Sequence, residues 1–224
     1  MEPIYENNEQ FTAFPDPDEV FLTDLDKSMM LPLALYRPHQ GQEILLAVPF
    51  GDEEGLIGKT SVSEECGEEW VTYSRHGDKW SLDCSADDLS SFDWTMGGGT
   101  KKGAIEDYRK NREAFARKGC ILNPYYKPNS KSYSPPRFPL FTPKEYAYWG
   151  SNWFAGISSV WKYRDHEIPS GKPYSNVIVM DSQGNEYDYL GYADSCLYCG
   201  YLNPELHFLY SKACERVLLA LEFV

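Results

Sequence analysis

Two strand–turn–strand patterns constrain the fold of this chain more than any other feature of its sequence. Residues 70–84 contain two runs of strand-forming residues separated by His-Gly-Asp, and residues 174–192 contain two more separated by Asp-Ser-Gln-Gly-Asn. Short connections rich in glycine, asparagine and aspartate are typical of β-hairpins, because these residues adopt the backbone angles that tight turns require. We therefore predict hairpins of an antiparallel sheet at about 70–84 and 174–192.

Two other stretches predict helices that pack on this sheet. Residues 103–118 place apolar side chains on one helical face and are followed by a glycine, where a helix would end. Residues 204–222 carry leucine, alanine and valine at helical spacing, and Asn203 followed by Pro204 fits a helix start. Hairpins and helices are segregated rather than alternating, which favours an α+β fold with an antiparallel sheet over a doubly wound parallel fold.

Prolines mark the least regular part of the chain. Residues 123–143 contain six prolines, a density that excludes both helix and central strand. We expect a single domain over residues 1–224, with this segment as the boundary if the chain is subdivided. Residues 142–145 combine threonine, proline and glutamate in the pattern of a helix N-terminus, so we predict that a helix starts there. Residues 152–163 predict a strand or an irregular buried segment.

The net charge of −13 is unevenly distributed along the chain. Residues 1–100 hold 5 Lys and Arg against 21 Asp and Glu, whereas residues 101–144 hold 11 against 3. Either folding lays these segments side by side so that their charges neutralise each other, or one face stays negative and steers a basic partner. The acids are densest between positions 52 and 69, which makes the candidate partner-binding residues Asp52, Glu53, Glu54, Glu64, Glu65, Glu68, Glu69 and Trp70.

Composition and the first residues bear on location and on other partners. A sequence pI of about 4.7 provides no basic footprint for phosphates, so we do not expect a nucleic-acid partner. The longest apolar run is too short to cross a bilayer, which argues against a membrane protein. The N-terminus has neither the basic nor the apolar region of a secretory signal. We therefore expect a cytoplasmic protein whose six cysteines are free thiols.

Two short motifs have residues suited to chemistry, and each has a structural alternative. Cys196 and Cys199 have the spacing of zinc ligands or of a redox pair, but no second pair completes a zinc site, so buried thiols fit as well. His166 between Asp165 and Glu167 would suit acid–base catalysis, although a turn also explains this triplet. The remaining histidines are scattered without metal-ligand spacing: His39, His76 and His207.

No catalytic motif in the sequence is specific enough to predict a reaction. The acidity and the 15% aromatic content favour a non-enzymatic protein-binding module. One form of it would be an immunity-type inhibitor that neutralises a basic partner, such as a toxin, by masking its active surface. We expect neither a cofactor nor a metal. The alternatives are a carboxylate and histidine hydrolase or transferase of unknown substrate, or a small zinc or thiol module that uses Cys196 and Cys199.

Overall fold

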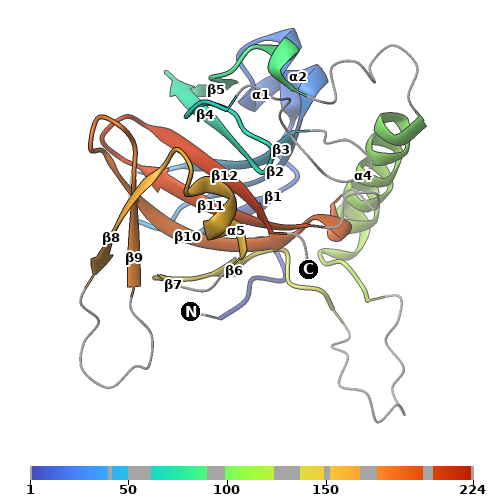
Figure 1. Cartoon of the computed structure of the whole chain (residues 1–224). Coiled ribbons are helices and arrows are strands. Elements are labelled where there is room, and N and C mark those ends of the chain that lie inside the picture. The colour runs from blue at the N-terminus through green and yellow to red at the C-terminus, as the bar shows by residue number, and fades with distance from the viewer. Residues whose placement is uncertain are drawn as a thin grey trace.

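Antiparallel β-structure dominates the fold, in one three-stranded and one nine-stranded sheet (Figure 1). This computed structural model describes residues 2–39, 42–49, 62–89, 99–123, 137–148, 152–166, 176–198 and 204–222. The small sheet consists of β1 (Phe11–Ala13), β2 (Met30–Tyr36) and β3 (Ile44–Pro49). The large sheet consists of β4 (Trp70–His76), β5 (Lys79–Leu82), β6 (Thr142–Pro143), β7 (Ala147–Tyr148), β8 (Lys162–His166), β9 (Asn176–Met180), β10 (Glu186–Asp194), β11 (Glu205–Ser211) and β12 (Arg216–Glu222).

The order of strands in the large sheet is β5-β4-β12-β11-β10-β9-β7, with β6 paired to β10 and β8 paired to β9. The described helices are α1 (Pro17–Val20), α2 (Asp24–Met29), α4 (Gly99–Lys118) and α5 (Asn152–Ile157), with short 3₁₀ turns η1 (Ala86–Asp88) and η2 (Ser195–Leu197). None of the helices in the described residues is long and apolar enough to cross a bilayer. The mixed α+β class predicted from the sequence is confirmed, with sheet as the larger part.

Both predicted hairpins are present. β4 pairs antiparallel with β5, and Gly77 in their turn has a φ of 69°, a left-handed angle that glycine adopts without strain. β9 pairs antiparallel with β10, and Gly184 in that turn has a φ of 84°. The helix predicted at 103–118 is confirmed as α4, which begins earlier, at Gly99, and is closed by Gly119 with a φ of 69°.

The prediction of a helix at 204–222 is wrong, because this segment is the hairpin of β11 and β12. The two strands pair from Glu205 opposite Glu222 down to their turn. Both faces of the hairpin are buried: Leu218 belongs to one hydrophobic core and Leu219 to the other. A strand buried on both faces has no polar–apolar alternation, so the period that distinguishes strand from helix is missing from its sequence.

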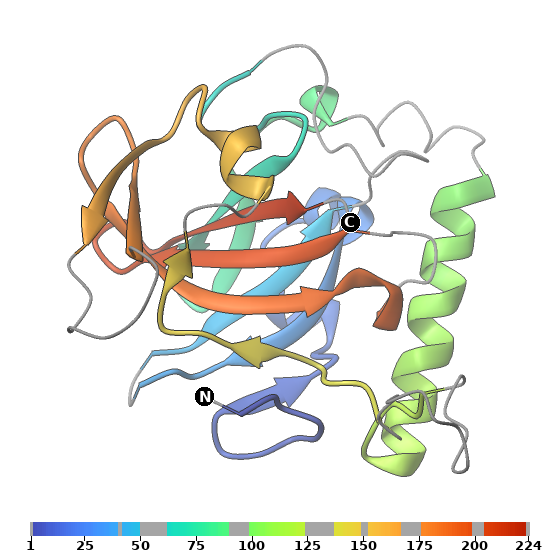
Figure 2. The ribbon, with the colours of Figure 1, turned by 60° about the horizontal axis from the view of Figure 1, so that its bottom comes forward.

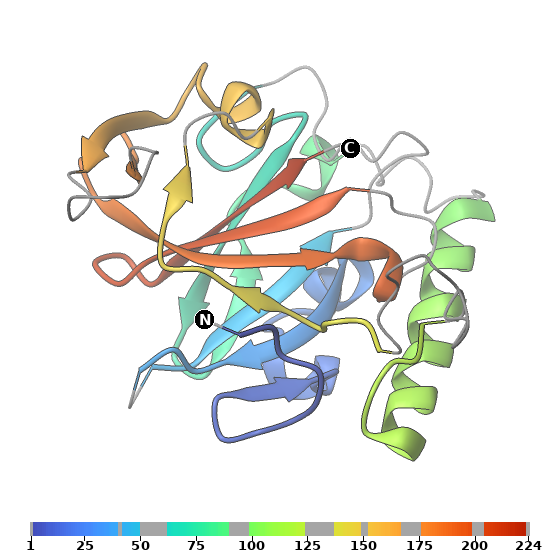
Figure 3. The ribbon, with the colours of Figure 1, turned by 90° about the horizontal axis from the view of Figure 1, so that it is seen from below.

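The large sheet separates two hydrophobic cores. One face packs against the small sheet, whose strands lie beside it in Figure 3. The other face packs against α5, whose Trp153, Phe154 and Ile157 belong to the second core. Tyr73 of β4 links the two sheets, because its buried hydroxyl donates to the Leu45 carbonyl at 2.8 Å and accepts from the Ala47 amide at 3.1 Å, both in β3.

Three further predictions have different outcomes. The helix start predicted at 142–145 is wrong: Pro143 lies in the short strand β6, which pairs with β10 opposite Gly191. Residues 152–163 form neither a single strand nor an irregular segment, because α5 precedes β8. In the proline-rich segment, residues 124–136 lie outside the described residues, so a subdivision there stays a prediction.

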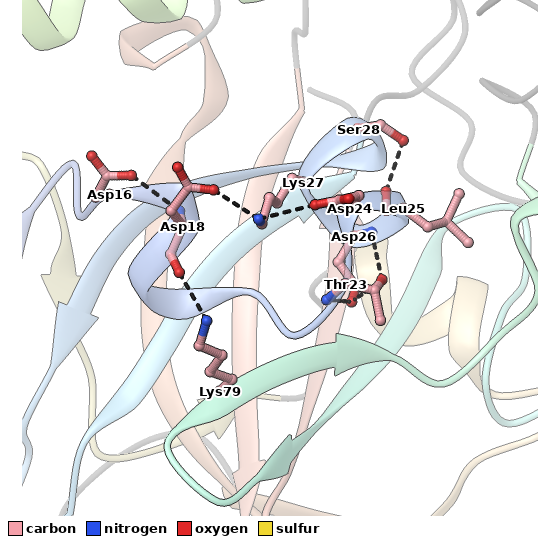
Figure 4. Close-up of polar contacts among 9 residues, drawn as sticks. All are labelled: Asp16, Asp18, Thr23, Asp24, Leu25, Asp26, Lys27, Ser28 and Lys79. Atoms are coloured by element: carbon pink, nitrogen blue, oxygen red, sulfur yellow. Dashed lines mark hydrogen bonds and ion pairs between the residues drawn. The ribbon is translucent and has the colours of Figure 1, made fainter.

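The segment of α1 and α2 covers the outer edge of β5. The Leu22 amide donates to the Trp80 carbonyl at 2.9 Å, so the covering segment takes up one of the edge's hydrogen-bonding groups. The buried Asp26 carboxylate forms a capping box with Thr23 at the start of α2 (Figure 4). The same carboxylate accepts a hydrogen bond from the Leu82 amide of β5 at 3.0 Å. One side chain therefore both caps the helix and holds it to the strand.

Candidate functional site

The predicted partner-binding residues differ in how the structure places them. Three lie outside the described residues: Asp52, Glu53 and Glu54. Four lie in the segment that leads into β4, which we call the acidic loop: Glu64, Glu65, Glu68 and Glu69. Trp70 is only 3% exposed, and its indole N–H donates to the Ser63 carbonyl at 3.1 Å. The Trp70 side chain therefore belongs to the hydrophobic core.

The acidic loop lies against α5 and the β9–β10 turn. Glu64 accepts a hydrogen bond from the Ser182 amide in that turn. The Glu69 carboxylate lies against α5, where a Cβ added to Gly156 would be 1.8 Å from Oε2. Burial raises the pKa of Glu69, and the negative charge of Glu68 adds to this rise. The loop thus holds like charges close together.

The basic segment does not neutralise the acidic loop within the described part of the chain. Described ion pairs of residues 101–144 join Arg109 to Glu113, Lys110 to Asp107, Arg112 to Asp16, and Arg137 to Glu6. No described Lys or Arg forms an ion pair with a carboxylate of the acidic loop. The helix α4, which carries seven of the eleven Lys and Arg of residues 101–144, lies on a different side of the molecule from α5 (Figure 2). Two of these pairs neutralise acids of residues 1–100, but none reaches the acidic loop, so the second interpretation of the charge pattern stays open for the loop alone.

A second acidic group, which the sequence did not predict, lies at the open end of the β11–β12 hairpin. Glu205 stands directly opposite Glu222 across the hairpin, and His207 is two residues along β11. Because side chains alternate across a strand, Glu205 and His207 point to the same face, and cross-strand partners share that face. One side-chain nitrogen and two carboxylate oxygens, one from each residue, lie within 4.8 Å of one another.

The histidine in this group is buried and its carboxylate neighbours are not. His207 is 5% exposed, whereas the side chains of Glu205 and Glu222 are 40% and 15% exposed. Nε2 of His207 lies 3.0 Å from Oε2 of Glu222 and 3.7 Å from Oε2 of Glu205. The 3.0 Å contact does not meet the geometry of a hydrogen bond, and Nε2 has no other hydrogen-bond partner among the described residues.

Aromatic rings fix the orientation of the imidazole. Trp153 of α5 and the β10 residues Tyr189 and Tyr192 stack on His207, with ring centroids 5.5, 6.0 and 5.8 Å away. The Tyr189 hydroxyl is also hydrogen-bonded to Nδ1 of His207 at 2.8 Å. Together with Glu205, His207 and Glu222, these rings line a cavity of about 240 Å³, which we call the His207 pocket.

A bulge in β10 brings both tyrosines to this pocket. Residues three apart on a regular strand point to opposite faces, yet Tyr189 lies opposite Leu209 and Tyr192 lies opposite His207. The register shifts between Tyr189 and Gly191, and this shift puts the two tyrosines on one face. Gly191 has a φ of 134° and lies close to β6, where a Cβ would be 2.2 Å from the Thr142 carbonyl oxygen.

The pocket carries uncompensated negative charge. Burial lowers the pKa of His207 to about 3, so the imidazole is neutral at pH 7. Burial raises the pKa of Glu205, and the charges of Glu222 and Asp194 add to the rise. No described Lys or Arg forms an ion pair with Glu205 or Glu222; Lys144, at the rim, lies over the Tyr192 ring instead. This arrangement is suited to binding a cation.

Sequence reasoning missed the pocket because it assigned the segment to a helix. At about 1.5 Å per residue, Glu205 and Glu222 would be about 25 Å apart in a helix, whereas in the hairpin they are cross-strand neighbours. One signal in the sequence could have revealed the site. If residues 205–211 are interpreted as a strand, Glu205 and His207 fall on one face, and Glu222 falls opposite Glu205 in the second strand of the hairpin.

The two motifs noted in the sequence remain predictions. Cys196 lies at an exposed position in η2, but Cys199 lies outside the described residues, so neither a zinc site nor a redox pair is tested. Asp165 and the backbone of His166 belong to β8, whereas the His166 side chain and Glu167 lie outside the described residues.

Comparison with known proteins found no family model, no curated protein and no solved structure that matches this chain.

Proposed function

We propose that this protein is a non-enzymatic binding module that engages a basic partner protein through the acidic loop and the surface around α5. The observation that carries the proposal is that Glu64, Glu65, Glu68 and Glu69 form no ion pair with any described Lys or Arg. A surface of one sign raises the rate at which an oppositely charged protein associates, and it rejects partners of like charge.

The His207 pocket extends the same acidic surface. The Glu69 carbonyl accepts a hydrogen bond from the Leu221 amide at 2.7 Å, so the acidic loop lies next to the end of β12. Glu222 follows in that strand and accepts a hydrogen bond from the Asn152 amide at the start of α5 at 3.0 Å. Both acidic groups therefore adjoin α5, which supports one negative surface rather than two separate patches.

An immunity-type inhibitor is the form of this function that we favour. Such a protein neutralises a basic toxin by covering its active surface, which needs fast association and no catalytic machinery of its own. The experiment begins with affinity capture from lysate of the source cells and identification of basic proteins released by high salt. The purified partner is then assayed for an activity that the full chain suppresses.

A matched pair of triple variants tests the electrostatic mechanism. The first neutralises the acidic loop (Glu64→Gln, Glu65→Gln, Glu68→Gln), and the second neutralises three acids outside it (Glu9→Gln, Asp87→Asn, Glu106→Gln). Both change the net charge by the same amount, so general attraction falls equally. We expect the first to reduce the association rate by about tenfold more than the second, with dissociation changed little. Equal reductions would remove the acidic loop from the interface, and binding that does not depend on salt would refute electrostatic steering.

A further inference from the structure

We propose that Glu205, His207 and Glu222 bind a divalent transition-metal ion. This inference goes beyond the proposed function and does not depend on it, because the site can be tested without a partner protein.

The spacing of the ligand atoms suits a metal ion. Zinc bonds of about 2.0–2.2 Å to nitrogen and oxygen, arranged tetrahedrally, place two ligand atoms about 3.4 Å apart. Nε2 of His207 lies 3.0 Å from Oε2 of Glu222 and 3.7 Å from Oε2 of Glu205, so the observed separations fall on either side of this value. Small rotations of the two partly exposed glutamates would bring all three atoms to one ion.

The imidazole nitrogen provides the second, independent observation. His207 is 5% exposed, yet its Nε2 makes no hydrogen bond with any described residue. Buried polar atoms in folded proteins nearly always have a partner, so a buried nitrogen that lies 3.0 and 3.7 Å from two carboxylate oxygens without a hydrogen bond indicates a missing ligand. A metal ion would satisfy this nitrogen and both carboxylates at once.

The charge of the pocket favours a cation over an anion or a neutral ligand. Glu205 and Glu222 lie directly opposite each other across the hairpin, so two carboxylates face the same pocket. One nitrogen and two oxygen ligands suit zinc or manganese, whereas calcium and magnesium prefer oxygen ligands alone.

Neighbouring groups hold the ligands in the orientation that a metal would need. When Nδ1–H of His207 donates to the Tyr189 oxygen, 2.8 Å away, Nε2 carries no hydrogen and its lone pair is available to a metal ion. The Asn152 amide donates to Oε1 of Glu222, which leaves Oε2 of that carboxylate directed at His207. Three protein ligands beside a cavity leave a further coordination position for water.

The test is a titration of the full-length chain with zinc after removal of bound metal by a chelator. We expect one saturable site by calorimetry and metal analysis, and a melting temperature that rises with zinc concentration. Glu205→Gln and Glu222→Gln preserve shape while removing a charged ligand, so each should weaken zinc binding at least tenfold. Glu215→Gln is the matched control at the other end of the same hairpin, and it should bind zinc as the wild type does.

Substitution of cobalt for zinc separates this site from the cysteines. Coordination by nitrogen and oxygen gives no thiolate-to-cobalt charge-transfer absorption, whereas binding at Cys196 or Cys214 would give it. Three outcomes would each overturn the proposal. They are the lack of a saturable zinc site, thiolate absorption when a single cobalt ion is bound, and wild-type zinc affinity in both glutamine variants. If Glu222→Gln fails to fold, Glu205→Gln still decides, because that side chain is 40% exposed and outside the core.

Discussion

Replacement of Gly191 by alanine should destabilise the protein strongly. A Cβ at this position would lie 2.2 Å from the Thr142 carbonyl oxygen and 2.8 Å from Cα of Pro143, and both atoms belong to the backbone of β6. Unlike the end of a flexible side chain, a paired backbone segment cannot rotate away. In addition, the φ of 134° at Gly191 is one that residues with a side chain rarely adopt.

The magnitude follows from these two terms. A strained backbone angle costs about 1–3 kcal/mol, and forcing extra volume into a packed site costs about 1–3 kcal/mol. The free energy of unfolding should therefore fall by roughly 2–6 kcal/mol, a large share of the total of about 5–15 kcal/mol for a typical domain. For a chain of 224 residues, this corresponds to a melting temperature lowered by at least about 4 °C, and by about 8–16 °C for a loss of 4 kcal/mol.

The matched control is Gly184→Ala in the β9–β10 turn. Gly184 also has a positive φ, of 84°, but a Cβ there would meet no atom within 4 Å. Its replacement should cost only the backbone term, about 1–2 kcal/mol. Urea and thermal unfolding followed by circular dichroism measure both variants. If Gly191→Ala loses no more stability than Gly184→Ala, the close approach of β6 to the bulge is refuted.

Two further predictions concern Tyr73 and Glu69. Tyr73→Phe should lower the free energy of unfolding by about 2–4 kcal/mol, measured by urea titration. The variant leaves the Leu45 carbonyl and the Ala47 amide without their buried hydrogen-bond partner. A change below about 0.5 kcal/mol would contradict the role of the Tyr73 hydroxyl in joining the two sheets. Glu69→Gln should stabilise the protein at pH 7. The folded-state pKa of Glu69 is raised by burial and by Glu68, so the wild type gains stability as pH falls and the carboxyl takes up a proton. The advantage of the variant should therefore shrink from pH 7 to pH 4, and an advantage independent of pH would show that the charge is not its cause.

The sequence predicted elements well where local chemistry decides the structure. The turns at Gly77 and Gly184 need left-handed angles that few residues adopt, and the end of α4 at Gly119 has the same cause. These signals act over a few residues, so no knowledge of the tertiary packing is needed to read them. The α+β class was predicted from the hairpins and two helices; α4 supports it, whereas the segment 204–222 is a third hairpin.

The β11–β12 hairpin shows where this reasoning fails. Leu218 and Leu219 are both fully buried, on opposite faces, because the sheet lies between two cores. Burial on both faces is a property of the whole fold, so the sequence of these strands alone cannot reveal it. The same error hid the His207 pocket, since Glu205 and Glu222 come together only through the pairing of the two strands. The acidic loop was visible in advance because its residues are close in the sequence.

The contact of α2 with β5 bears on how the protein behaves at high concentration. A strand at the edge of a sheet exposes unpaired amides and carbonyls, and another copy of the chain can pair with them as the first step of aggregation. Here the Trp80 carbonyl is occupied by the Leu22 amide and the Leu82 amide by the Asp26 carboxylate. The chain therefore blocks this edge against self-association with its own N-terminal segment. Deletion of residues 1–26 removes both contacts and should increase the formation of intermolecular sheet at high protein concentration, even though residues 62–89 keep their sequence.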